Sequence, residues 1–331
     1  MTELFKHLNQ DVVIPDARAD AEGRGESARR RVLGRLGEYA SIIVGPLNLR
    51  PSAAILLAAD DERIEVRIST PTSHVVLVIV PDGDLAAEVF FLRALAGKHL
   101  PVPRLIGHDL SCAIVPFTYA LESYAGGMPL DRLEDHSVVR VAARQLGRTL
   151  RRAHQLSAPG FGRPTTTGRW PSRTWIDTLN GWLARRAVLE RAEELLGAEC
   201  ATAWRKATLD HPALAWERPC LIHGAVDPAR AIVTVGDGVQ LEALSRPGEI
   251  VGGDPLFDLA HGLLPRYPAA FRRGLIEGYT ATGLLTAEQE RRLQRLRLLL
   301  WVADALSHAD TQAFARLPDE LASALEALGN G

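Results

Sequence analysis

The sequence predicts a two-lobed α+β fold, with a β-rich first lobe, a mainly helical second lobe and a cleft between them. Apolar and alternating runs separated by turn residues follow one another from Ser41 to Val80, which predicts three to five antiparallel strands. From Val138 onward the apolar residues recur mostly at helical spacing. The chain has 331 residues, more than one core usually holds. The expected divisions are a lead-in at 1–30, a β-rich lobe at 31–123 and a helical lobe at 124–331.

The elements of each lobe are placed by apolar pattern and by helix start and stop signals. The expected strands of the first lobe are SIIVG, SAAILLAA, RIEVRIS and HVVLVIVP. A helix is expected from Asp84, as its N-cap, to a stop at Gly97. Late in the second lobe, Thr286 and Gln289 form a capping-box pattern at the start of a long helix. The arginines of that helix, within 291–297, are expected on a solvated face.

Composition and charge limit the classes of function that the chain can have. A hydrophobic content of 47% and a charged content of 24% indicate a globular chain. The formal net charge of -2 argues against nucleic-acid and membrane-surface partners, which favour a basic excess. Three cysteines without metal-ligand spacing, and no apolar signal segment, favour a cytoplasmic location. Cations are nearly all arginine, which, with the alanine content, suggests a GC-rich bacterial genome.

An ordered set of segments resembles the aminoglycoside phosphotransferase and choline kinase-like family, whose fold is similar to that of protein kinases. The segments are DLAAEVFFLRALAGKHLPVPRLIGHD, LESYAGGMPL, LGRTLRRAHQLSAPGFG, LIHGAVDPARAIV and VGGDPLFDLAHGL, and the resemblance spans roughly residues 30–310. It implies a hinge between Leu121 and Leu130 and a catalytic loop at Leu221–Val233. It also implies the family's usual helix histidine at His154.

Phosphoryl transfer requires positioning and charge neutralisation more than covalent chemistry from the protein. In the family this resemblance implies, a third-strand lysine, held by a helix glutamate, binds phosphates. A catalytic-loop aspartate accepts the proton of the attacking hydroxyl. An asparagine and a second aspartate supply the oxygen ligands that Mg²⁺ demands.

Four of these working positions are replaced in this chain. The resemblance puts Ala225 at the base position and Arg230 at the asparagine position. The second metal position is Ala243, and the third-strand lysine position is Val78. Neighbouring Glu242 should face the opposite side of its strand. We therefore expect no bound metal and no nucleotide cofactor.

Other positions of the implied frame remain. A degenerate nucleotide cleft is expected around Val78, Glu88 and Glu122, where Glu88 is the helix glutamate without its lysine. The phosphate-covering turn is expected at GPLNLRPS, which holds a single glycine, Gly45. The residues expected to keep structural roles are His223, Asp254 and Asp258.

Several side chains carry alternative interpretations. Asp227 is either a displaced base or a solvated loop carboxylate, and His223 either a general base or a turn-forming residue. Arg230 either binds an anion in the cleft or lies on the surface. Glu88 either serves a new ligand or pairs with an arginine such as Arg67 or Arg93. Three tryptophans either line a substrate pocket in the helical lobe or pack in the core: Trp170, Trp175 and Trp216.

The resemblance thus implies a pseudokinase that binds a protein, a peptide or a small ligand instead of transferring phosphate. A helper subunit beside a modifying enzyme in a bacterial biosynthetic pathway fits that interpretation. One alternative is a divergent phosphotransferase that uses ATP and Mg²⁺ with relocated acids: Asp227, Glu242 or Glu249. Another is a non-kinase enzyme that reuses the cleft.

Overall fold

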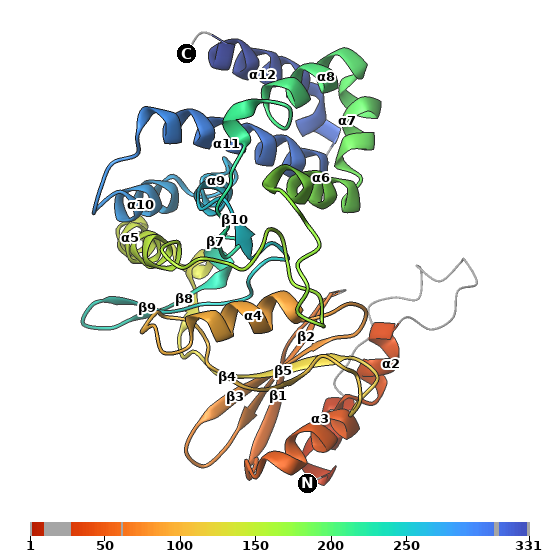
Figure 1. The fold of residues 1–331 in the computed structure, drawn as a ribbon. Coiled ribbons are helices and arrows are strands. Elements are labelled where there is room, and N and C mark those ends of the chain that lie inside the picture. The colour runs from red at the N-terminus through yellow and green to blue at the C-terminus, as the bar shows by residue number, and fades with distance from the viewer. Residues whose placement is uncertain (1, 10–27, 61, 308–310, 330–331) are drawn as a thin grey trace. The chain divides into compact units, whose positions relative to one another are not determined.

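The computed structural model describes residues 2–9, 28–60, 62–307 and 311–329 (Figure 1). Residues 10–27, most of the expected lead-in, lie outside this described part. The chain divides into two compact units. The N-terminal unit comprises residues 1–96 and 103–125, and the C-terminal unit comprises residues 97–102 and 126–331.

A five-stranded antiparallel sheet forms the centre of the N-terminal unit, in the order β1-β2-β3-β5-β4. Its strands are β1 (Ala53–Ala59), β2 (Ile64–Ser69), β3 (His74–Val80), β4 (Leu105–Asp109) and β5 (Thr118–Ser123). β2 and β3 are rich in Val and Ile, which suit a pleated, buried surface. This confirms the prediction of an antiparallel sheet from three of the four apolar runs.

Helices cover both faces of this sheet (Figure 1). On one face α4 (Ala86–Leu95) packs Leu85 and Val89 against Val78 and Ala120. The predicted cap at its start is present, because the Asp84 carboxylate accepts a hydrogen bond from Ala86 N at 2.8 Å. The elements on the opposite face are α1 (Thr2–Phe5), the 3-10 helix η1 (Lys6–Asn9), α2 (Ala28–Gly34) and α3 (Leu36–Val44).

The run SIIVG lies at the end of α3, so the prediction of a strand there was wrong. The buried residues of α3 include Leu36, Tyr39, Ala40 and Ile43, which recur at the spacing of a helix. The apolar run Ile42–Val44 hides this spacing, because periodicity alone cannot assign a short apolar run.

The C-terminal unit is mainly helical and contains two small sheets. Its helices are α5 (His136–Ala153), α6 (Trp175–Arg185), α7 (Val188–Leu196), α8 (Ala198–Ala207), α9 (Leu256–Gly262), α10 (Ala269–Tyr279), α11 (Ala287–Ser307) and α12 (Thr311–Gly329). One sheet pairs β7 (Cys220–Leu221) with β10 (Gly252–Gly253). The other has the order β6-β8-β9, from Met128–Pro129, Ala231–Val235 and Val239–Leu244. No helix within the described ranges is long and apolar enough to cross a membrane.

Helices α5 and α10 approach each other at backbone distance. A Cβ atom at Gly274 would lie 2.3 Å from Arg140 O, and one at Gly278 would lie 2.0 Å from Arg144 O. Only glycine therefore fits at these two positions. Glu277, between them, pairs with Arg140 and Arg144, which fixes the same contact from its exposed side.

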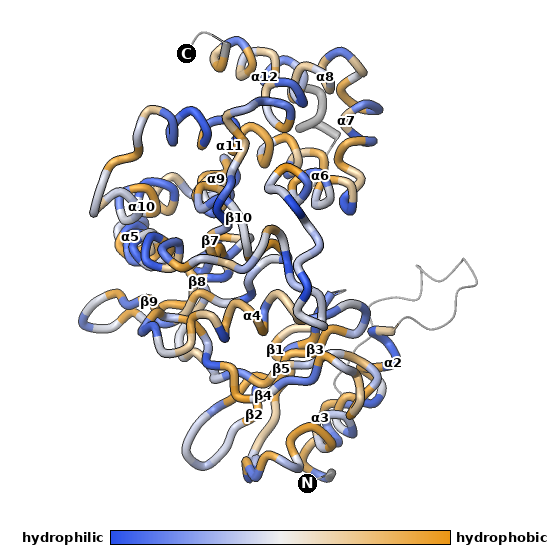
Figure 2. Tube along the Cα trace, in the orientation of Figure 1, coloured by the Kyte–Doolittle hydropathy of each residue, from blue (hydrophilic) through white to orange (hydrophobic). Residues whose placement is uncertain are grey.

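Helix α11 begins with the predicted capping box, because Thr286 N donates to Gln289 Oε1 at 2.9 Å and Gln289 N to Thr286 Oγ1 at 3.2 Å. Hydropathy along α11 changes from hydrophilic to hydrophobic (Figure 2). Its arginines do not all face solvent, which corrects the expectation of a solvated face. Arg292 is buried, pairs with the buried Asp254 at 2.8 Å, and stacks over Trp216 at 4.4 Å from the ring centroid.

We expect Arg292→Met to lower the free energy of unfolding by about 3–5 kcal/mol, because it leaves Asp254 buried without its counter-charge. Urea denaturation measures the change. The exposed neighbour Arg291→Met is the matched control and should change stability by less than about 0.5 kcal/mol. Adding Asp254→Asn should recover part of the loss; equal costs for the two arginine substitutions would contradict the assignment.

Candidate functional site

The loop that follows β7 is held by a buried carboxylate at the start of α9. Asp258 accepts hydrogen bonds from His223 N and Gly224 N, both at 2.6 Å, and from His154 Nε2 at 2.9 Å. Burial would raise the pKa of Asp258, but the bond from His154 and the neighbouring donors outweigh it, so the pKa is lowered. An ionised Asp258 thus sets the backbone path of the loop, as expected of a structural residue.

The imidazole of His223 is also committed to the shape of the loop. Its Nε2 donates to the carbonyl oxygen of Ser245 at 3.0 Å. Burial lowers the pKa of His223 to about 4, so the ring is neutral near pH 7. A general base works best with a pKa near the working pH. The geometry therefore favours the turn-forming interpretation of His223.

The position expected for the catalytic base is packed against the chain that follows β9. Ala225 is 8% exposed, and Gly248 N donates to His223 O at 2.8 Å. A Cβ atom at Gly248 would lie 2.6 Å from Gly224 O and 3.0 Å from the Ala225 methyl group. The Ala225 methyl group thus packs beside Gly248, where only a glycine leaves room for it.

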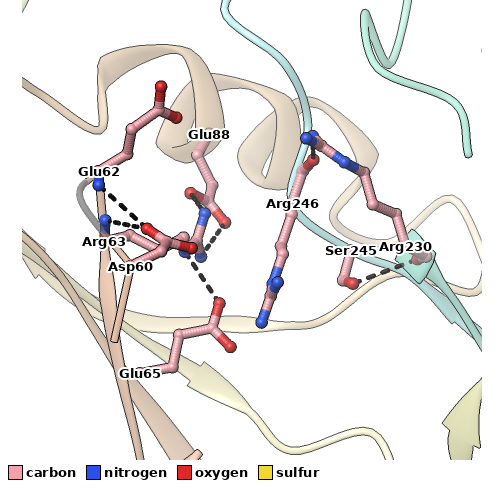
Figure 3. A network of polar contacts seen from close by, with 8 residues as sticks. All are labelled: Asp60, Glu62, Arg63, Glu65, Glu88, Arg230, Ser245 and Arg246. Carbon is pink, nitrogen blue, oxygen red and sulfur yellow. Dashed lines mark hydrogen bonds and ion pairs between the residues drawn. The ribbon is translucent and has the colours of Figure 1, made fainter. Parts of the chain in front are cut away.

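Asp227 and Arg230 neutralise each other. Asp227 Oδ1 accepts from Arg230 N at 3.0 Å, which caps the 3-10 helix η6 (Pro228–Arg230). Asp227 Oδ2 contacts Arg230 Nε at 2.8 Å. Figure 3 shows the other contact of this guanidinium, in which Arg230 Nη1 donates to Arg246 O. The candidate displaced base and the candidate anion ligand are thus each other's partners.

The register of β8 and β9 shows which residues accompany Arg230. Ala243 pairs with Ile232 and lies in the core, whereas Ser245 N donates to Arg230 O at 2.9 Å. Glu242 faces away from Ala243 and accepts from Thr234 Oγ1 at 2.7 Å, as strand alternation predicts. The residues beside Arg230 are therefore Ser245 and Arg246, rather than Ala243.

These residues do not fit Mg²⁺, which requires oxygen ligands, preferably carboxylates. The guanidinium of Arg230 and the methyl group of Ala243 occupy the two implied metal positions. Within the described part of the chain, no group of three or more His, Cys, Asp or Glu side chains is arranged to hold a metal ion.

In the N-terminal unit, the expected lysine position lies in the core. Val78 is 1% exposed, pairs with Glu65 and Ala120 on the neighbouring strands, and packs under α4. β3 contains no lysine. The strand that should present a cation to phosphates presents a buried methyl surface instead.

Glu88 nevertheless has a cationic partner, which the sequence analysis did not identify. The two terminal nitrogens of the Arg63 guanidinium, Nη1 and Nη2, donate to its carboxylate at 3.0 and 3.1 Å, and Arg63 Nε contacts Glu65 at 2.8 Å (Figure 3). Arg67 instead lies over the Tyr124 ring and Arg93 bonds to His108. Strand alternation could have identified Arg63 from the sequence, because it puts position 63 on the same face of β2 as Glu65.

A third carboxylate joins this cluster. Glu122 of β5 is 5% exposed, and burial, followed by repulsion from Glu88, raises its pKa well above the ordinary value. Its Oε1 atom has no hydrogen-bond partner among the described residues. Three buried glutamates thus share the one guanidinium of Arg63.

The turn between β1 and β2 contains further acidic residues. A loop that covers phosphates ahead of a third-strand cation lies between the first two strands. Here that turn reads Asp-Asp-Glu at 60–62, and Asp60 Oδ1 accepts from Glu62 N and Arg63 N at 3.0 and 2.7 Å. GPLNLRPS instead forms the 3-10 helix η3 (Gly45–Leu47) and a loop leading into β1, which corrects its assignment as the phosphate-covering turn.

The three tryptophans belong to the packing of the C-terminal unit. Trp175 is fully buried and meets Phe257 edge-to-face at 5.5 Å between centroids. Trp216 lies under Arg292, and Trp170 covers Gly160, where a Cβ atom would be 2.6 Å from that of Trp170. They are used for packing rather than to line a described pocket.

The comparisons with known proteins agree with this architecture. The sequence model of the phosphotransferase enzyme family matches residues 56–299, so the chain belongs to that family. No curated protein sequence matches the chain. The fold is that of protein kinases, in the variant found in aminoglycoside phosphotransferases.

Several solved structures are similar to this fold. A thermostable mutant of aminoglycoside phosphotransferase APH(4)-Ia, with ADP and hygromycin B, is similar with a TM-score of 0.64 and 16% identity over 88% of this chain and 98% of that chain. Macrolide 2'-phosphotransferase MphH from Brachybacterium faecium gives a TM-score of 0.55 and 18% identity over 86% and 96%. A putative fructosamine-3-kinase from Haemophilus somnus gives 0.55 and 14% over 86% and 95%.

We expect Arg63→Met to destabilise the protein by about 3–5 kcal/mol, because it leaves the buried glutamates without a counter-charge. Urea denaturation at neutral pH measures this. Arg67→Met, on the same face of β2 and paired with no carboxylate among the described residues, should cost only about 0.5–1 kcal/mol. Adding Glu122→Gln to Arg63→Met should restore part of the loss, and equal effects of the two arginine substitutions would refute the cluster.

The neutral His223 predicts a specific pH dependence. Its pKa of about 4 in the folded state lies below the ordinary value of 6.5, so the unfolded state binds more protons between these pH values. Acidification from pH 6.5 to 4 should thus remove about 3 kcal/mol of stability through this group. Unfolding free energies across this range should fall less steeply in His223→Gln, while the exposed His136→Gln should follow the wild type. Parallel profiles for wild type and His223→Gln would contradict the prediction.

Proposed function

We propose that this member of the phosphotransferase family is a pseudokinase that acts by binding, as a helper or scaffold subunit. Its partner is a protein or peptide, or a small ligand, and a modifying enzyme in a bacterial biosynthetic pathway fits that setting. The observation that carries the proposal is the packed loop around Ala225. There the base position is a buried methyl group against Gly248.

Electrostatics supports the proposal independently. A kinase must hold Mg²⁺ with anionic oxygens and nucleotide phosphates with cations. In the C-terminal unit, Arg230 takes the position that the family gives to a metal-binding asparagine. In the N-terminal unit, the implied lysine position Val78 pairs with Glu65 of the buried glutamate cluster. Within each unit, the charge is thus opposite to the one that a kinase uses.

A divergent phosphotransferase is the alternative, and one observation favours it. The Arg63–Glu88 pair provides a cation held by the helix glutamate, as the family's lysine is held, although from β2 instead of β3. Such an enzyme would act on a small-molecule or peptide hydroxyl, with Asp227 as its base. It would bind ATP and Mg²⁺ through groups other than Arg230 and Ala243.

A thermal-shift titration with ATP and Mg²⁺ separates the two proposals. Ligand at a hundredfold excess over Kd adds about 2.7 kcal/mol of apparent stability. We expect no rise in Tm for the pseudokinase and no ATP turnover. Asp227→Asn should leave both results unchanged, because asparagine still caps η6.

A Mg²⁺-dependent rise in Tm, with turnover that Asp227→Asn removes, would replace the proposal with the phosphotransferase. The control for general ion effects is the same titration with Mg²⁺ and a chelator. If no nucleotide binds, co-purification with the products of neighbouring genes is the direct way to a protein partner.

A further inference from the structure

A cavity of about 460 Å³ lies within the N-terminal unit, and its lining includes neither Arg63 nor Glu88. It is bounded by α2, by the start of α3 and by the ends of strands β3 and β5, at Pro81 and at Pro116 and Phe117. Its size falls within the range of about 300–1,000 Å³ that is usual for ligand sites.

Arginine side chains form one wall of this cavity. The sequence ARRRVLGR places Arg30, Arg31 and Arg35 on the lining, while Arg29 turns to the sheet and donates to Ala59 O at 2.7 Å. Glu38 binds Arg35 through two hydrogen bonds, at 2.8 and 2.7 Å. Arg31 is exposed and pairs with no carboxylate among the described side chains, so its guanidinium is available to an anionic group.

Apolar groups form the rest of the lining. Tyr39 and Phe117 are 8% and 2% exposed and meet edge-to-face at 4.9 Å between centroids. The prolines Pro81 and Pro116 flank them. An occupant that matches this cavity needs both an apolar group for the floor and negative charge for the wall.

The arginines and Tyr39 lie on α2 and α3, which precede residue 56, where the match to the family's sequence model begins.

We propose that this cavity binds an acidic segment of a partner protein, with an apolar side chain between carboxylates. Guanidinium groups suit carboxylates through paired hydrogen bonds, and the aromatic floor suits the apolar side chain. A free phosphate ion would leave the aromatic floor unfilled. Nucleic acid is disfavoured because the chain as a whole has a net charge of -2.

The test is fluorescence anisotropy with the intact protein and a fluorescein-labelled peptide in which glutamates flank a leucine–phenylalanine pair. We expect saturable binding that weakens as salt rises, and about a tenfold loss of affinity in Arg31→Glu. Arg148→Glu, an exposed arginine on α5, is the matched control and should bind as the wild type does. Unchanged Tm values for both variants show that folding is intact.

The other outcomes decide against the proposal. It is overturned if the wild type does not bind the peptide, if the glutamine version of the peptide binds equally, or if Arg148→Glu loses as much affinity as Arg31→Glu. Displacement by sodium phosphate at equal concentration would assign the cavity to small anions. Displacement by a synthetic peptide of residues 10–27 would assign it to this chain itself.

Discussion

The buried Asp258 carboxylate is the constraint on which the loop of this family member depends. It collects two backbone N–H groups of the loop and the imidazole of His154, which in turn contacts the Tyr279 hydroxyl at 3.0 Å. Charge-assisted hydrogen bonds of this kind are strong in a low-dielectric interior. They fix the loop from α5, α9 and α10, whatever side chains the loop presents.

This arrangement separates the shape of the loop from its chemistry. Gly224 adopts a φ of +77°, and a Cβ atom there would lie 2.0 Å from Ile250 O, so the backbone path itself demands glycine. Nothing in that path requires a carboxylate at 225 or an amide at 230. The fold and the match to the family's sequence model therefore do not by themselves determine the chemistry of this loop.

The sequence predicted what depends on local pattern and missed what depends on contact between elements. The β2 and β3 strands, the Asp84 cap and the capping box at Thr286 follow from spacing within a few residues. Arg63 lies 25 positions from Glu88, and only the strand register brings them together. Arg292 sits in an arginine-rich stretch that looks solvated, but its partner Asp254 belongs to another element.

Each unit differs in charge from the phosphotransferase pattern that the resemblance implies. In the catalytic loop, Arg230 stands where the resemblance implies a metal-binding asparagine, and it pairs with Asp227. The N-terminal unit carries carboxylates where phosphates would be held, and Arg63 is already shared among them. A relocated base such as Asp227 would repair neither reversal, because each concerns binding of the nucleotide and its metal rather than proton transfer.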